Sequence, residues 1–211
     1  QLAQCYSEYQ SELKRNQSRD SDDLLLQTVV LLENYPEVKK TINNKWKYIS
    51  ADENQDSSQL DSKLIYLLSG KNNNVFFVGD DNQSIYGFRG ADLEVMLNLR
   101  SLYPELKVYD LGINYRSTET IVEAGKSIIR NNKKQIEKSV KCGRGIKGSP
   151  VIITKCANQK DEANKIIAYV KMLHNKKGLK YSEIAILNRM SYLSRTIEEA
   201  LMRAKIKYTL V

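Results

Sequence analysis

The sequence predicts an α/β fold built on parallel sheets, and two observations support this prediction. The apolar run at residues 75–78 stops abruptly at Gly79-Asp80-Asp81, as a buried strand does when it delivers polar groups to the edge of a sheet. In addition, residues 117–211 alternate between apolar runs with strand character and segments with helical periodicity. Such alternation is typical of parallel sheets with right-handed crossovers.

In the first half of the chain, we expect helices at residues 1–16 and after Asp20, because apolar residues there recur at helical spacing and an acidic residue suits a helix N-terminus. Pro36 should begin another helical turn. Residues 46–51 have the composition of a strand, and the segment 59–68 follows it with helical periodicity. The order is therefore helix, helix, strand, helix, and then the strand at residues 75–78.

In the second half, the signals for helices are caps and the signals for strands are short apolar runs. Asp92, Asn158 and Ser194 each precede a segment with helical periodicity, and a further helix follows Ser117. Four short runs are expected to be strands. They are residues 107–111, 150–154, 183–187 and 208–211.

The composition of the chain favours a globular protein with a polyanionic partner. The 211 residues are 41% hydrophobic, enough for a core in one large or two small domains, and the formal net charge is +8. The three cysteines are far apart without a Cys-x-x-Cys pair, which fits a reducing compartment and gives no metal site. No apolar run approaches the roughly 18 residues of a membrane span and no signal peptide is recognisable, so we expect a cytoplasmic protein without a membrane partner.

The basic residues concentrate between positions 126 and 147. This window holds eight lysines and arginines and one acidic residue, Glu137. One interpretation is a solvated helix face and loop, which is the usual meaning of a charge run. The other is contact with a nucleic-acid backbone. The sequence leaves both interpretations open.

Asp52 and Glu53 follow the expected strand at residues 46–51. A carboxylate at the end of a buried strand is well placed to hold Mg²⁺, and an adjacent carboxylate can orient and deprotonate an attacking water. Asp-Glu is nevertheless a common dipeptide, and a strand that simply leaves the core for solvent would explain it equally well. The surrounding motifs are needed to choose between these interpretations.

Three motifs together resemble a known family. The string Gly-Asp-Asp-Asn-Gln-Ser-Ile-Tyr-Gly-Phe-Arg-Gly-Ala-Asp at residues 79–92 resembles motif III of superfamily-1 DNA helicases of the UvrD/PcrA/Rep type. Asp52-Glu53 lies one helix earlier, where the family has motif II, and Asn-Tyr-Arg-Ser at residues 114–117 resembles motif IV. The resemblance covers essentially the whole chain but only a middle part of a whole helicase. It implies two RecA-like parallel-sheet motor domains, both incomplete here.

The resemblance implies an ATP site that uses Mg²⁺. Asp52 would be the Mg²⁺ ligand, Glu53 the catalytic base, and Gln55 a polar residue of the nucleotide site. Gln83 would sense the γ-phosphate, because an amide can donate to a phosphate oxygen or accept from water once the phosphate has left. These roles are what the family position implies for each residue.

The same resemblance assigns the aromatic and arginine side chains of motifs III and IV. Tyr115 would stack on the adenine and Arg116 would stabilise charge on the γ-phosphate as an arginine finger. Tyr86 and Phe88 would stack on DNA bases, and Arg89 would contact phosphate or brace the loop. The alternatives are that the aromatic rings pack in the core and that Arg116 pairs with a carboxylate.

The implied domains are the end of a helical insertion subdomain (1–17), the C-terminal part of the first RecA-like domain (18–106) and the N-terminal part of the second (107–211). The implied function is that of an ATP-dependent 3′-to-5′ DNA helicase and translocase, acting on single-stranded and duplex DNA in repair or replication. Two alternatives remain: the motor subunit of a helicase-nuclease, and a non-catalytic DNA-binding relative.

Some features depart from the family pattern. Ser21 and Asn54 stand where the family usually has aromatic residues, and Ser50-Ala51 replaces bulkier apolar residues. The sequence also has no complete Gly-x-x-x-x-Gly-Lys-Ser/Thr pattern, the Gly-rich loop that cradles the β- and γ-phosphates. We therefore expect residues 1–211 alone not to hydrolyse ATP.

Overall fold

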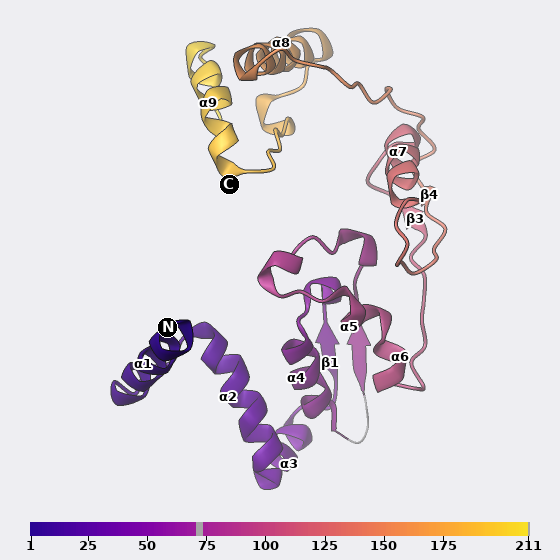
Figure 1. The fold of residues 1–211 in the computed structure, drawn as a ribbon. Coiled ribbons are helices and arrows are strands. Elements are labelled where there is room, and N and C mark those ends of the chain that lie inside the picture. The colour runs from indigo at the N-terminus through magenta and orange to yellow at the C-terminus, as the bar shows by residue number, and fades with distance from the viewer. Residues whose placement is uncertain (71–73, 211) are drawn as a thin grey trace. The chain divides into compact units, whose positions relative to one another are not determined.

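The computed structural model describes residues 1–70 and 74–210, and its contacts divide the chain into two compact units, residues 1–150 and 151–211. Figure 1 shows the order of the elements. The helices are α1 (Leu2–Arg15), α2 (Ser21–Asn34), α3 (Pro36–Lys45), α4 (Gln59–Ser69), α5 (Leu93–Leu97), α6 (Leu99–Leu102), α7 (Glu119–Ile129), α8 (Gln159–Lys177) and α9 (Ser194–Arg203). The strands are β1 (Ile49–Ala51), β2 (Val75–Phe77), β3 (Ile113–Asn114) and β4 (Lys141–Cys142). Short 3₁₀ turns are η1 (Asn54–Asp56), η3 (Asp81–Gln83), η4 (Gly87–Arg89), η5 (Tyr181–Glu183) and η6 (Ser191–Leu193).

Two helices of the first unit, α2 and α4, begin at side chains that cap them. Asp20 accepts a hydrogen bond from the backbone of Asp23 at 2.7 Å, which caps α2. Ser58 and Asp61 exchange the two hydrogen bonds of a capping box at the start of α4. Each of these bonds satisfies a backbone N–H that the helix itself leaves without a partner, so the predicted helix starts are confirmed.

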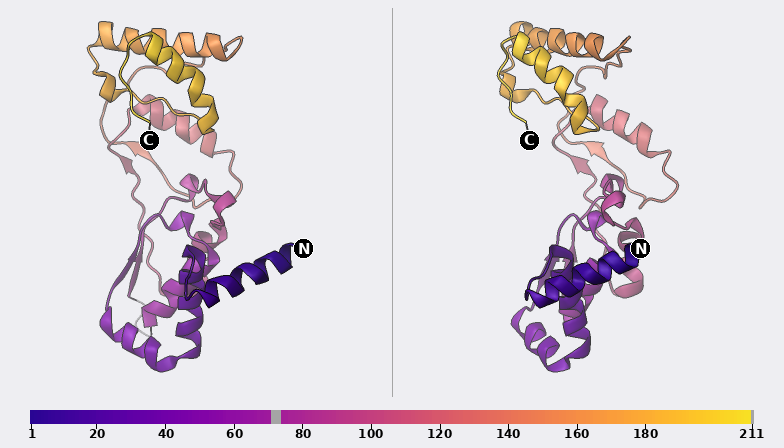
Figure 2. Two further views of the ribbon diagram at one scale, coloured as in Figure 1. Left: turned by 90° about the vertical axis from the view of Figure 1, so that its left-hand side faces the viewer. Right: turned by 60° about the vertical axis from the view of Figure 1, so that its left-hand side comes forward.

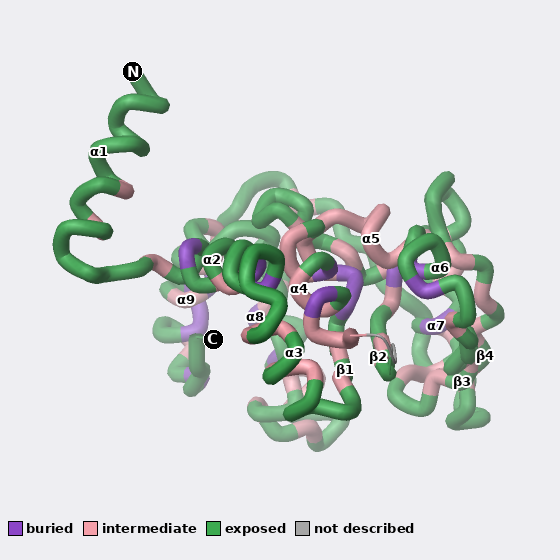
Figure 3. Tube along the Cα trace, turned by 90° about the horizontal axis from the view of Figure 1, so that it is seen from below, coloured by how far each residue is buried: buried purple, intermediate pink, exposed green. Residues whose placement is uncertain are grey.

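The first unit has its core between α2 and α4. Val29, Leu32 and Leu67 are buried there, and side chains of α3 and α4 pack around them. By contrast, α1 buries none of its residues, as Figure 3 shows. It is tied to α2 by polar contacts, including a 2.8 Å hydrogen bond from Tyr9 Oη to Asp20.

The strands β1 and β2 form a parallel pair in which Ile49 lies opposite Val75 and Ala51 opposite Phe77. Figures 1 and 2 show them as neighbouring arrows that point the same way. Because parallel strands end at the same edge of a sheet, the residues after Ala51 and after Phe77 are brought together. This edge carries the candidate site.

Several expected strands are wrong. The strand predicted at residues 46–51 is confirmed only for Ile49–Ala51, and the segments 107–111, 150–154, 183–187 and 208–210 are not strands; Val211 lies outside the described residues. A strand requires a neighbouring strand for its backbone hydrogen bonds. Within the described residues, none of the four segments that are not strands has such a neighbour. Their side chains show the consequence: Ile153 is 96% exposed and Leu187 is 93% exposed.

The α/β class is confirmed as two small parallel pairs flanked by helices, because β3 and β4 also pair in parallel. In the unit 151–211, the core lies between α8 and α9 and includes Ala163, Ile167, Ile197 and Leu201. Asn158 caps α8 by accepting from the backbone of Asp161. No helix of the described residues is long and apolar enough to cross a membrane.

Candidate functional site

Two acidic residues stand at the end of β1. Asp52 and Glu53 follow the strand directly, both are exposed, and Asp52 Oδ1 accepts a 2.9 Å hydrogen bond from the backbone of Glu53. Glu53 has a φ of 50°, in the left-handed region that residues other than glycine rarely adopt. Backbone strain of this kind is concentrated at functional sites, where the surrounding structure holds it in place.

Gln55 links the ends of the two strands. Its side chain is almost completely buried; Nε2 donates to Glu53 Oε2 at 2.7 Å, and Oε1 accepts from the backbone N–H of Asp80 at 3.0 Å. A Cβ at Gly79 would lie 2.8 Å from Gln55 Oε1, so only glycine lets the β2 end approach this closely. The predicted nucleotide-site residue thus lies inside the protein, where it orients Glu53.

Asn54, one of the departures from the family pattern, is also buried. Its Oδ1 accepts a 3.4 Å hydrogen bond from Ser57, but Nδ2 has no hydrogen-bond partner within the described part of the chain. A buried donor without a partner costs free energy, and an aromatic ring at this position would not incur that cost. Asn54 therefore leaves a buried amide nitrogen without a partner next to Glu53 and leaves the two carboxylates in place.

Gln83 is brought to the same edge by η3, which follows β2. Gln83 Nε2 donates to Asp80 Oδ2 at 2.8 Å, so the expected phosphate sensor is held by the first acid after Gly79. Burial opposes the charged form of the Asp80 carboxyl, but hydrogen bonds from Lys138 and Gln83 outweigh burial, and the pKa of Asp80 lies below its ordinary value. Asp80 is therefore an ionised acceptor at neutral pH.

Lys138 is the residue of this site that the sequence did not reveal. It belongs to the basic window 126–147, yet its Nζ binds the carboxylates of both Asp80 and Asp81. The only signal in the sequence is that the apolar Ile136 and Val140 lie two residues before and after Lys138; in the structure, these three residues are less exposed than the two between them. This alternation places a lysine on the inward side of an extended segment.

Tyr86, Phe88 and Arg89 form an exposed cluster after η3. The rings of Tyr86 and Phe88 have centroids 6.0 Å apart, and the Arg89 guanidinium lies 5.3 Å from one and 5.5 Å from the other. Phe88 is 74% exposed. Tyr86 is 38% exposed, so neither ring is buried in the core.

Tyr115 and Arg116 follow β3 and are both exposed. Asn114 Oδ1 accepts from the backbone N–H groups of Arg116 and Ser117, at 3.0 and 2.8 Å, and so fixes the turn. A Cβ at Gly143 would lie 2.8 Å from the Tyr115 ring, which shows how closely the residue after β4 approaches it. No hydrogen bond or ion pair of the described residues joins Tyr115 or Arg116 to the cluster at the end of β1 and β2.

The carboxylates fit Mg²⁺ in the way that nucleotide sites usually hold it. The described residues contain no group of three or more acidic, histidine or cysteine side chains that could cage a metal ion. Mg²⁺ in such sites keeps several waters and takes one or two carboxylates plus substrate phosphates. The exposed Asp52, with its second oxygen available to solvent or ligand, meets that requirement.

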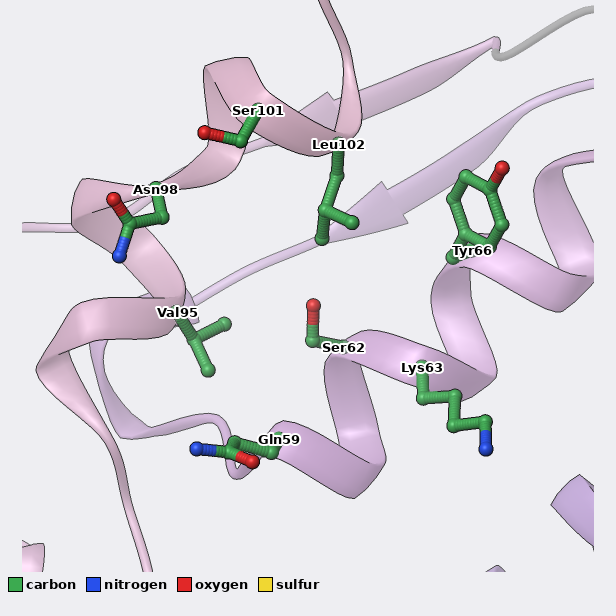
Figure 4. A pocket seen from close by; sticks show the side chains of 8 residues that line it. All are labelled: Gln59, Ser62, Lys63, Tyr66, Val95, Asn98, Ser101 and Leu102. Atoms are coloured by element: carbon green, nitrogen blue, oxygen red, sulfur yellow. The ribbon is translucent and has the colours of Figure 1, made fainter.

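A cavity of about 350 Å³ lies between α4 and the helices α5 and α6 (Figure 4). Its lining residues are Gln59, Ser62, Lys63, Tyr66, Val95, Asn98, Ser101 and Leu102. None of these is a predicted site residue. The candidate chemistry therefore lies at the open edge of β1 and β2 and not in this cavity.

Comparisons with known proteins agree with the motifs. The family model described as the UvrD/REP helicase N-terminal domain matches residues 1–104, and the one described as the UvrD-like helicase C-terminal domain matches residues 109–211. Curated relatives include proteins named ATP-dependent DNA helicase PcrA from Staphylococcus aureus and from Staphylococcus epidermidis. This chain is 39% identical to each over 210 residues, which is 100% of this chain and 28% of each relative. The chain thus spans little more than a quarter of the length of the relatives it matches.

Proposed function

Because this chain belongs to the UvrD/PcrA-type superfamily-1 helicase family, we propose that the full-length gene product hydrolyses ATP to move along single-stranded DNA and unwind duplex DNA. Movement in the 3′-to-5′ direction and a role in repair or replication are parts of this proposal. So are the domain boundaries, with residues 18–106 in the first motor domain, 107–211 in the second, and 1–17 at the end of an insertion.

One observation carries the proposal: the chain of contacts from Glu53 through Gln55 and Asp80 to Gln83. Glu53, the proposed base, and Gln83, the proposed phosphate-sensing amide, both follow the carboxyl ends of two parallel strands, which supports the proposal. Ligands of open α/β sheets bind at such edges. The two side chains to which we assign hydrolysis are connected through the buried Gln55 and through Asp80.

In the proposed reaction, Glu53 accepts a proton from the water that attacks the γ-phosphate, and Gln55 holds the Glu53 carboxylate in the direction this requires. Asp52 would hold Mg²⁺, which neutralises charge on the phosphates. Gln83 contacts the γ-phosphate with its amide. These are the groups of the β1 and β2 edge.

The remaining predicted residues complete the proposal. Tyr115 stacks on the adenine and Arg116 stabilises charge on the γ-phosphate in the transition state. Tyr86 and Phe88 stack on the bases of single-stranded DNA, beside the cationic Arg89. Their exposure in the structure supports roles toward a ligand.

The test is the steady-state ATPase of the full-length gene product, with and without single-stranded DNA, beside Glu53→Gln. General-base catalysis is worth roughly 10²- to 10⁴-fold, so Glu53→Gln should reduce DNA-stimulated turnover by at least about 10²-fold. Glu37→Gln, a change at an exposed acid of α3, is the matched control and should leave turnover intact. DNA binding without any ATP hydrolysis would refute the proposal and indicate a non-catalytic DNA-binding protein.

A further inference from the structure

Lys138 joins the segment after α7 to the loop that carries Gln83. Its Nζ binds Asp80 Oδ1 and, at 2.5 Å, Asp81 Oδ1. The Lys138 side chain is 19% exposed, that of Asp81 is 1% exposed and that of Asp80 is 38% exposed. The Lys138–Asp81 pair is therefore screened by salt much less than a pair at the surface, and the Lys138–Asp80 pair lies at the edge of this buried contact.

The two oxygens of Asp80 have different partners. Oδ1 accepts from Lys138 and from the backbone of Asn82, and Oδ2 accepts from Gln83 Nε2. An ionised carboxylate can only accept, so the Gln83 amide must turn its nitrogen toward Asp80. Its oxygen, which has no hydrogen-bond partner among the described residues, then points to the other side. The direction of the amide therefore depends on Asp80 remaining charged and in place.

Asp81 fixes Lys138 from a second direction. Its Oδ2 accepts a 2.8 Å hydrogen bond from the backbone N–H of Ile136, two residues before Lys138. The segment 136–138 is therefore attached by its backbone as well as by the lysine side chain. This attachment restricts where the Lys138 ammonium can lie. A lysine on an unattached segment would not be restricted in this way.

Other lysines of the basic window do not share this environment. Lys134 pairs with Glu94 at 2.5 Å, but its side chain is 72% exposed. Lys126 pairs with Glu123 one turn earlier in the same helix. Lys138 alone of these three reaches an acid that contacts a predicted site residue.

We propose that Lys138 is a positioning residue for Gln83: it holds Asp80 in place, neutralises its charge, and so sets the direction of the Gln83 amide toward the nucleotide. The inference rests on the proposed function. It also assigns to part of the basic window a role other than DNA contact. Without Lys138, the negative charge of Asp80 would be uncompensated beside the proposed ATP phosphates. The Gln83 amide would then lose the fixed carboxylate that sets its direction.

The experiment compares Lys138→Met, Lys138→Arg and Lys134→Met in the full-length gene product. Met removes the charge at similar length, Arg keeps it, and Lys134→Met is the matched loss of an exposed charge. Hydrogen bonds to charged groups are typically worth enough for roughly tenfold effects. We expect Lys138→Met to lower kcat of the DNA-stimulated ATPase about tenfold, with KM for ATP changed less than about twofold.

A second measurement does not depend on ATPase activity. Hydrogen exchange of the peptide covering residues 79–90 should become faster in Lys138→Met and should stay unchanged in Lys134→Met. Lys138→Arg should keep both kcat and the slow exchange.

The inference is overturned if exchange of this peptide is unaffected, if kcat is unaffected, or if Lys134→Met has the same effects. Absence of ATPase in the wild-type protein would overturn the proposed function and, with it, a role of Lys138 in hydrolysis. The exchange measurement would still decide whether Lys138 holds the Gln83 loop, so the two failures are distinguishable.

Discussion

Gln55 donates from Nε2 to Glu53 Oε2 over 2.7 Å, although Gln55 is 1% exposed and Glu53 lies at the surface. The same amide accepts from the backbone of Asp80 through Oε1. A buried side chain thus sets the orientation of an exposed carboxylate and joins the ends of two strands. The contribution of Gln55 to activity is therefore inseparable from its contribution to stability.

We expect Gln55→Ala to lower the free energy of unfolding by about 2–4 kcal/mol, because it leaves a cavity and removes the acceptor of the Asp80 backbone N–H. ATPase activity of the full-length protein should also fall, since Glu53 loses the donor that orients it. Denaturant titration and steady-state kinetics measure the two effects. Gln4→Ala in the exposed helix α1 is the control. Equal stability of the two variants would contradict the interpretation.

The ion pair of Lys138 and Asp80 should make stability depend on pH. Burial opposes the charge of Lys138, but its bonds to Asp80 and Asp81 outweigh burial and raise the pKa of Lys138 above its ordinary 10.5. The pKa of Asp80 is lowered below 3.8. Stabilisation by the charge of Asp80 is therefore present above pH 3.8 and is lost as the pH falls through the lowered pKa of Asp80. Stabilisation by the charge of Lys138 is present below pH 10.5 and is lost as the pH rises through the raised pKa of Lys138.

Unfolding measured at pH 7 should accordingly separate wild type from Lys138→Met, and unfolding at a pH well below the lowered pKa of Asp80 should bring the two proteins together. Lys134→Met is again the control, because the Lys134 side chain is 72% exposed and an exposed ion pair contributes little. A difference between wild type and Lys138→Met that is the same at both pH values would show that the lysine acts through packing rather than charge.

The helices were predictable because their signals are local. Asp20, Asp92 and Asn158 each cap the helix that follows, and the residues involved lie within a few positions of one another. The strands were predictable only where a partner exists. Residues 150–154 and 183–187 have strand composition, but composition does not supply the neighbouring backbone that a strand needs.

The sequence alone could propose residues for the site, but it could not specify their arrangement. The motifs identified Glu53, Gln55 and Gln83, and the structure brings all three together. The hydrogen bond from the Asp80 backbone to Gln55 joins residues 25 positions apart. The contact of Lys138 with Asp80 joins residues 58 positions apart. No local pattern specifies such pairs, since they arise only when the strand ends meet and the segment after α7 packs against η3.

Gly143→Ala tests whether the position of the Tyr115 ring matters for ATP binding. The new methyl group would lie 2.6 Å from the Ile113 side chain and 2.8 Å from the Tyr115 ring, so the ring must move. If Tyr115 stacks on adenine, KM for ATP should rise severalfold while DNA affinity stays unchanged. Gly125→Ala is the matched control: its Cβ meets nothing within 4 Å, and it should stabilise α7 by about 0.5–1 kcal/mol. An unchanged KM in Gly143→Ala would argue against the adenine role of Tyr115.

Phe88→Ala separates a role in DNA binding from a role in folding. Because Phe88 is 74% exposed, its removal should change the free energy of unfolding by less than about 0.5 kcal/mol. Base stacking on an aromatic side chain is worth roughly 1–3 kcal/mol, so affinity for single-stranded DNA should fall about tenfold or more. Fluorescence anisotropy with a labelled oligonucleotide at fixed salt measures the affinity.

Phe88→Trp is the variant that decides between stacking and simple hydrophobic contact. An indole presents a larger π-face, so stacking predicts affinity equal to or above that of wild type, whereas Phe88→Leu should lose most of the affinity although it stays apolar. Arg89 lies 5.5 Å from the same ring, and its charge should contribute in a salt-dependent way. If Phe88→Leu binds as tightly as wild type, the ring does not stack on DNA and Phe88 serves another purpose on this exposed surface.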